Sequence, residues 1–123
     1  MIVLVIGSAL RSLGVDQEAM GLTFLEEAST APKYRLYSLD ERWAALVPVD
    51  SGGVSVAGEL VEVSDERWPE IVASEPPGIV PGPIQLADGR EVTAALGDPD
   101  HMERHAVEIT EHGSFAAYLA SLP

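Results

Sequence analysis

The chain has 123 residues, of which 46% are hydrophobic and 22% charged, and it contains no cysteine. This composition indicates one globular domain over residues 1–123, and it excludes a disordered chain, a disulfide scaffold and any site built on a cysteine nucleophile or a zinc thiolate. The net charge of −13, from 20 acidic and seven basic residues, argues against binding to nucleic acid or to an anionic membrane, because both require clustered Lys and Arg.

Neither a membrane span nor a signal peptide is predicted. No apolar run approaches the roughly 18–20 residues that cross a bilayer. The opening segment 1–7 (MIVLVIG) is too short for the apolar core of a signal peptide, and no basic residue precedes it. We therefore expect a cytoplasmic protein.

The first half of the chain predicts strands around one helix. Residues 2–6 (IVLVI) form a β-branched and leucine run typical of a buried strand, and the small-residue loop 7–14 (GSALRSLG) follows it. The apolar spacing in residues 16–28 (DQEAMGLTFLEEA) predicts a helix. Three further strands are predicted at residues 34–39, 44–49 and 54–63. The apolar parity of the last strand changes at Gly58, which indicates a bulge or a sharp bend there.

The second half begins with a helix over residues 64–74, which Ser64 can cap and which must end before Pro76. The remaining predicted elements are a hairpin of strands 78–86 and 91–97, a turn or short helix at 98–104, a short strand at 106–109 and a helix at 114–122. Because most connections between strands are short, we expect an α+β protein with a curved or barrel-like sheet rather than a doubly wound parallel one.

The histidines do not form a recognisable metal motif. His101 and His105 stand at i and i+4, but Glu103 is not at the position that the H-E-x-x-H pattern requires. No convincing third ligand is present, although Glu108 or His112 could be proposed. An exposed polar segment is the simpler interpretation, so no metal site is predicted.

Glu75, in the stretch 72–80 (VASEPPGIV), allows two interpretations. It follows a predicted helix, and both the negative end of that helix and burial would raise its pKa, which suits a residue that accepts a proton and returns it. The alternative is an exposed carboxylate at a helix end, which spacing and composition alone favour.

Two other positions carry open alternatives. The loop after the first strand, around Gly7 and Ser8, can present backbone N–H groups to a ligand, or it can be a tight turn without function. Ser8 lacks the G-x-S-x-G context of a nucleophile elbow. Glu59 shares its parity with Val61 and Val63. If that face of the strand is buried, Glu59 needs an arginine or backbone donors as partners, and a structural role is the favoured interpretation.

Several segments resemble the γ-glutamylcyclotransferase-like superfamily. VIGSAL, YRLYSL and VAGELVEVSDERWPEIVASEPPG keep the order of that superfamily's Tyr-Gly-Ser/Thr-Leu loop, Y-x-L-Y strand, G-E-L-Y-E-V strand and helix ending in L-D-x-x-E-G. A closer resemblance, carried by TAPKYRLYSL, IQLADGREV and EITEHGSFAAYLA, is to the C-terminal domain of allophanate hydrolases. The resemblance spans nearly the whole chain, and it implies a γ-glutamylcyclotransferase-like mixed β-barrel with flanking α-helices.

The resemblance also implies a pocket where the first loop meets the helix that ends near Glu75. In the cyclotransferases the loop holds the substrate and the glutamate moves its proton, and Glu75 matches that catalytic residue. The residues implied to bind substrate are Gly7, Ser8, Ala9, Leu10 and Arg35, with Arg11 as another candidate for a substrate carboxylate.

The sequence departs from both groups in the loop. Ile6 stands where the cyclotransferases have a tyrosine, and Ala9 stands where the allophanate hydrolase domain has a functional histidine. That domain in turn has an apolar residue at the position of Glu75. The chain thus combines the sequence of one group with the carboxylate of the other.

Two functions follow from the resemblance. The first is an enzyme that acts on a small amide or carbamate bearing a carboxylate, with Glu75 as general acid and base and with no cofactor, because proton transfer and backbone polarisation suffice. The alternative is a non-catalytic metabolite-binding or accessory module that works with a separate amidase or allophanate hydrolase in urea or carbamate metabolism. The expected partners are a small carboxylate or amide ligand and, in the alternative, that amidase. The oligomeric state cannot be predicted.

Overall fold

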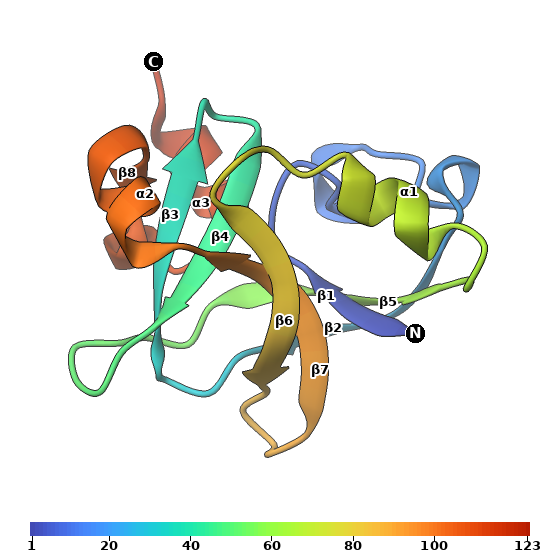
Figure 1. Ribbon diagram of the computed structural model, residues 1–123, viewed down its shortest axis with the longest axis horizontal. Helices are drawn as coiled ribbons and strands as arrows, with labels where there is room; N and C mark the ends of the chain where they lie inside the picture. Colours follow the sequence, from blue (N-terminus) through green and yellow to red (C-terminus); the bar gives the residue numbers. More distant parts are fainter.

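Eight strands form one mixed, curved sheet in the computed structural model, which describes residues 1–123. The strands are β1 (Ile2–Val5), β2 (Leu22–Ser29), β3 (Tyr34–Leu39), β4 (Trp43–Pro48), β5 (Ala57–Val63), β6 (Ile79–Gln85), β7 (Glu91–Gly97) and β8 (Val107–Glu108). The α-helices are α1 (Trp68–Ala73), α2 (Pro99–His105) and α3 (Phe115–Ser121), and the 3-10 turns are η1 (Arg11–Leu13), η2 (Glu18–Met20) and η3 (Thr110–His112). The α-helices flank the sheet (Figure 1).

The sheet curls at β7. The strand order is β2-β5-β1-β7-β4-β3-β8, and β6 pairs with β7 outside this path. Thr93 of β7 pairs in parallel with β1, whereas Leu96 pairs in parallel with β4. An isolated bridge between Thr30 and Leu86 joins the end of β2 to the β6–β7 hairpin. The predicted α+β fold with a barrel-like sheet and flanking helices is confirmed, although the sheet does not close into a complete barrel.

The helix predicted for residues 16–28 is wrong. Only the 3-10 turn η2 is helical there, and it ends at Gly21, whose φ of 79° is in the left-handed region that suits glycine. The strand β2 then pairs along β5, from Leu22 opposite Val63 to Ser29 opposite Ala57. Pairing with a strand that is distant in the sequence overrides the helical spacing of the apolar residues, because cross-strand contacts outweigh local propensity.

The irregularity expected at Gly58 lies on the partner strand. The register of β2 and β5 is regular at Gly58 and shifts between Phe24 and Glu26. Gly58 serves another purpose, since a Cβ atom there would lie 2.5 Å from the carbonyl oxygen of Val5. The glycine therefore permits the close approach of β1 and β5.

The helix and hairpin predictions for the second half of the chain are confirmed within a few residues. The Ser64 hydroxyl accepts a hydrogen bond from the N–H of Arg67 (3.2 Å) just before α1, and α1 ends before Pro76. The Ser114 hydroxyl caps α3 by accepting from the N–H of Ala117 (3.0 Å). Residues 98–104 form most of α2.

Three apolar clusters hold these elements together. The largest gathers side chains from β1, β3, β4, β5, β6 and β7 and includes Phe115 of α3. A second cluster places Met102 of α2 against β3 and β4. In the third, Trp68 and Ile71 of α1 pack against β2 and β5. No helix combines the length and apolar character that a bilayer span requires.

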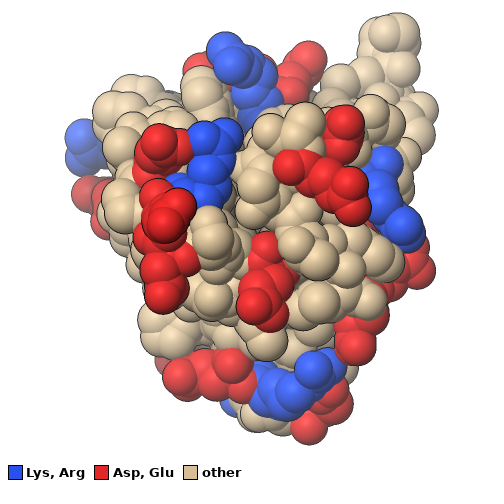
Figure 2. All heavy atoms as spheres, turned by 90° about the vertical axis from the view of Figure 1, so that its right-hand side faces the viewer, with Lys and Arg blue, Asp and Glu red and all other residues tan.

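Charged side chains are interspersed on the α1 side of the molecule. Figure 2 shows acidic and basic groups mixed among uncharged areas, without a continuous basic patch on this face. This face lacks the dense cationic surface on which binding to nucleic acid depends.

Candidate functional site

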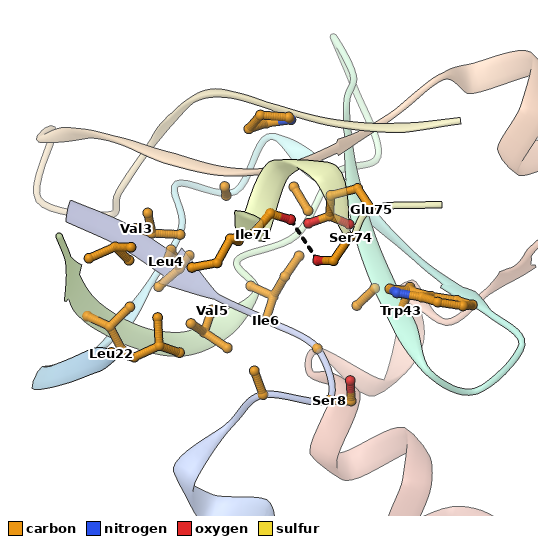
Figure 3. A pocket seen from close by; sticks show the side chains of 18 of the residues that line it. Val3, Leu4, Val5, Ile6, Ser8, Leu22, Trp43, Ile71, Ser74 and Glu75 are labelled. Carbon is orange, nitrogen blue, oxygen red and sulfur yellow. Dashed lines mark hydrogen bonds between the residues drawn. The ribbon is translucent and has the colours of Figure 1, made fainter. Parts of the chain in front are cut away.

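A cavity of about 230 Å³ lies between the end of β1, the start of β4 and helix α1 (Figure 3). Twenty-two residues line the cavity and 16 of them are hydrophobic, so its walls are mainly apolar. Apart from the indole N–H groups of Trp43 and Trp68, its polar side chains are those of Ser8, Arg42, Ser74 and Glu75. An apolar pocket with a few polar groups is the usual form of a small-molecule site.

Glu75 reaches the cavity from the C-terminal end of α1. Its N–H donates to the carbonyl of Val72 (3.2 Å), and the hydroxyl of the preceding Ser74 donates to the carbonyl of Ile71 (2.7 Å), so the final turn holds the backbone in place. The carboxylate takes part in no ion pair or side-chain hydrogen bond. Burial raises the pKa of Glu75 above its ordinary value of 4.5, because desolvation disfavours the charged form.

The loop after β1 lines the other side of the same cavity. In Figure 3, Glu75 lies above Ile6 and Ser8 lies below it. The backbone N–H groups of Gly7, Ser8 and Ala9 donate no hydrogen bond within the protein. Gly7 also lies close to β4, since a Cβ atom there would be 3.1 Å from the backbone nitrogen of Ala44. The cavity therefore contains a carboxylate and a loop with unused backbone donors.

The buried carboxylate of Glu59 on β5 binds the backbone of the segment that follows β1. It accepts hydrogen bonds from the N–H groups of Arg11 (2.6 Å) and Ser12 (3.2 Å) and from the side-chain amide of Gln17 (3.0 Å). The same amide donates to the carbonyl of Ala9 (3.0 Å). Two backbone N–H groups and one side-chain amide thus satisfy the buried carboxylate. Burial of a charge without hydrogen-bond donors would be costly.

Two of the predicted substrate-binding residues lie outside the cavity. Leu10 is buried in the main core, and the guanidinium of Arg35 on β3 lies 4.0 Å from Glu108. Arg11, the other candidate, stacks its guanidinium 3.6 Å from the centroid of the Phe24 ring. The cavity contains neither arginine.

Sequence reasoning missed Arg42, the only cation in the cavity lining. Arg42 ends the turn between β3 and β4, where its N–H donates to the carbonyl of Leu39 (3.1 Å). A basic residue just before a predicted strand was the available signal, but the sequence does not show which way that turn faces.

The histidine pair lies apart from the cavity on α2. The rings of His101 and His105 have centroids 4.6 Å apart, and neither residue lines the cavity. No group of three or more His, Cys, Asp or Glu side chains is arranged to hold a metal ion.

Residues 1–120 match the family described as the allophanate hydrolase C-terminal domain. The chain belongs to this family. Among proteins with curated descriptions, none matches the sequence.

Several solved structures share the fold of this chain. A uropathogenic E. coli-specific protein is 30% identical, with a TM-score of 0.85, and the match covers 99% of this chain and 97% of that one. An allophanate hydrolase from Kluyveromyces lactis is 23% identical (TM-score 0.82), and a urea amidolyase from K. lactis is also 23% identical (TM-score 0.83). Each match covers 97% of this chain but only 21% of the hydrolase and 8% of the amidolyase. The fold therefore occurs both as nearly a whole chain and as a small part of much larger proteins.

Proposed function

We propose that the cavity is the active site of an enzyme that acts on a small amide or carbamate bearing a carboxylate, with Glu75 as general acid and base. The observation that carries this proposal is the shared cavity. A partly buried carboxylate with a raised pKa and a loop with unused N–H groups line one small space. A base with a pKa moved toward neutrality and donors for a developing oxyanion are the two requirements of acyl chemistry without a cofactor.

The proposed chemistry consists of two proton transfers. The Glu75 carboxylate takes a proton from the nucleophile, either water or an amine of the substrate itself, and the freed lone pair forms a bond to the carbonyl carbon. The carbonyl electrons move to its oxygen, which the loop N–H groups of Gly7, Ser8 and Ala9 stabilise. When the intermediate collapses, the carbon–nitrogen bond breaks, and Glu75 gives its proton to the leaving amine.

The test compares the wild type with Glu75→Gln. Purified protein is offered γ-glutamyl amino acids, N-acyl amino acids and N-carboxycarbamate, and amine or carbon dioxide release is measured. We expect turnover of at least one substrate class and a loss of about 100-fold in kcat in the variant. Glu66→Gln, an exposed change just before α1, is the matched control and should retain full turnover. Equal turnover by the wild type and Glu75→Gln would remove Glu75 from the mechanism.

The raised pKa of Glu75 also predicts how stability depends on pH. The folded-state pKa of Glu75 lies above the unfolded value of about 4.5. The contribution of this side chain to the free energy of unfolding is therefore fully present below pH 4.5, and it is lost as the pH rises through the folded-state pKa. The stability of Glu75→Gln relative to the wild type should therefore increase over that interval. Urea denaturation of both proteins across this pH range measures the difference, and a pH-independent difference would contradict the burial of the carboxylate.

The alternative function is a non-catalytic metabolite-binding or accessory module that works with a separate amidase or allophanate hydrolase. The loop favours it, because Ile6 and Ala9 replace the polar residues of the two groups that the sequence resembles. The K. lactis relatives also favour it, since the same fold is a small part of an allophanate hydrolase and of a urea amidolyase. Analytical ultracentrifugation of this protein mixed with an amidase from its own host would show a complex if the alternative is correct.

A further inference from the structure

The cavity has an apolar wall that a small, fully polar substrate would leave uncovered. Sixteen hydrophobic residues contribute to its lining. The wall under α1 is formed by half-buried apolar side chains of α1 and β1, namely Trp68, Ile71, Val72, Val3 and Val5. The buried Leu22, Val61 and Val63 lie behind them. Apolar surface of this kind favours ligand groups that lose water when they bind.

Arg42 is the only cation in the lining, and it has no acidic partner. Four other arginines each lie within 4.0 Å of a carboxylate, namely Arg35, Arg67, Arg90 and Arg104. In a chain with 20 acidic residues and seven basic ones, an arginine without an ion pair at a cavity is available for an anion from outside. A guanidinium suits a carboxylate because it can donate two parallel hydrogen bonds.

The turn before Arg42 fixes where this cation lies. Asp40 and Glu41 both have positive φ angles, 55° and 57°, which are the dihedrals of the tight hairpin turn that matches the twist of paired strands. The guanidinium carbon of Arg42 lies 4.8 Å from the centroid of the Trp43 ring. Trp43 also lines the cavity, so stacking on this ring holds the cation at the cavity rim.

We propose that the cavity binds a monocarboxylate with an apolar body, whose carboxylate pairs with Arg42 and whose apolar part lies against the wall under α1. Resting on the function proposed above, this inference narrows the substrate to an amide or carbamate of an apolar monocarboxylate, of which N-acyl derivatives of apolar amino acids are the simplest examples. It disfavours N-carboxycarbamate, whose two carboxylates would meet one cation and whose body has no apolar group.

The protein carries its own reporter for the test. Its two tryptophans, Trp43 and Trp68, both line the cavity, so intrinsic fluorescence can follow binding without a label. Four probes separate the features of the ligand. N-acetyl-leucine has an amide, a carboxylate and an apolar side chain, N-acetylglycine lacks the side chain, N-acetyl-leucinamide lacks the charge, and malonate is wholly polar.

We expect N-acetyl-leucine to bind most tightly. Loss of its side chain or of its charge should each weaken binding by about tenfold. Arg42→Gln should weaken the binding of N-acetyl-leucine by about the same factor. It should leave the binding of N-acetyl-leucinamide unchanged, because that ligand has no carboxylate to pair with the arginine. Arg104→Gln on α2, outside the cavity, is the matched control. Val72→Gln, which makes the wall more polar, should reduce the advantage of N-acetyl-leucine over N-acetylglycine.

Tighter binding of malonate than of N-acetyl-leucine would overturn the proposal, and so would an unchanged preference for the carboxylate in Arg42→Gln. These outcomes are separable from the failure of the catalytic proposal. If Glu75→Gln keeps full turnover while Arg42 still selects the carboxylate, the role of Glu75 as general acid and base fails and the assignment of Arg42 stands. If Glu75→Gln loses turnover while Arg42→Gln binds normally, catalysis stands and the assignment of Arg42 fails.

Discussion

Glu59→Ala is expected to lower the free energy of unfolding by about 3–5 kcal/mol. The carboxylate is almost fully buried, with 3% of its residue surface exposed, and it accepts hydrogen bonds from two backbone N–H groups and from Gln17. Alanine would leave two backbone N–H groups and one N–H of the buried Gln17 amide without their acceptor. Denaturation in urea, followed by tryptophan fluorescence, measures the loss.

Glu62→Ala is the matched control for this experiment. Glu62 lies on the same strand, β5, but its side chain is exposed, so its removal should change the unfolding free energy by less than about 0.5 kcal/mol. A loss below about 1 kcal/mol for Glu59→Ala would mean that the loop finds other acceptors. Because Gln17 also bonds to the carbonyl of Ala9, we expect Glu59→Ala to weaken ligand binding at the cavity as well.

Phe115→Ala should have an effect of similar size, about 3–5 kcal/mol, through a different cause. Phe115 is completely buried and is the residue of α3 that enters the main core. Truncation would leave a cavity among close-packed side chains that cannot collapse to fill it. Denaturation in urea measures the change, with the exposed Ala120→Ser on the same helix as the control.

The consequence of Phe115→Ala for function should be small, because α3 does not line the cavity. At temperatures where the variant remains folded, its affinity for N-acetyl-leucine should equal that of the wild type. A loss of affinity without unfolding would show that the core transmits strain to the loop after β1. Glu59→Ala and Phe115→Ala therefore distinguish a contact that positions the site from one that only stabilises the fold.

The two charged residues that line the cavity, Glu75 and Arg42, carry opposite charges. The pKa of Glu75 is raised by desolvation, and Arg42 forms no ion pair with it. This separation matters for the proposed chemistry, because a carboxylate paired with arginine would hold a low pKa and would be a weak base. A substrate carboxylate can then occupy Arg42 while Glu75 remains free to move protons.

Local signals in the sequence determined much of the fold. The strand 2–6, the hairpin around residues 87–90 and the helix capped by Ser114 follow from apolar periodicity, turn residues and caps, which act within a few positions. Motif order along the chain likewise placed it in its family. The carboxylate of Glu75 and the loop at Gly7 were both selected from the sequence, through a resemblance rather than through spacing alone.

Only the tertiary structure decided the rest. Residues 22–29 form a strand instead of a helix because they pair with β5 along its length. A local sequence pattern cannot indicate a pairing partner that is so distant in the chain. Arg42 faces the cavity while Arg35 does not, because the side of a sheet that a residue faces and the direction of a turn depend on how strands from the whole chain assemble. Sequence periodicity describes each segment by itself, whereas a binding site is formed by segments that meet in space.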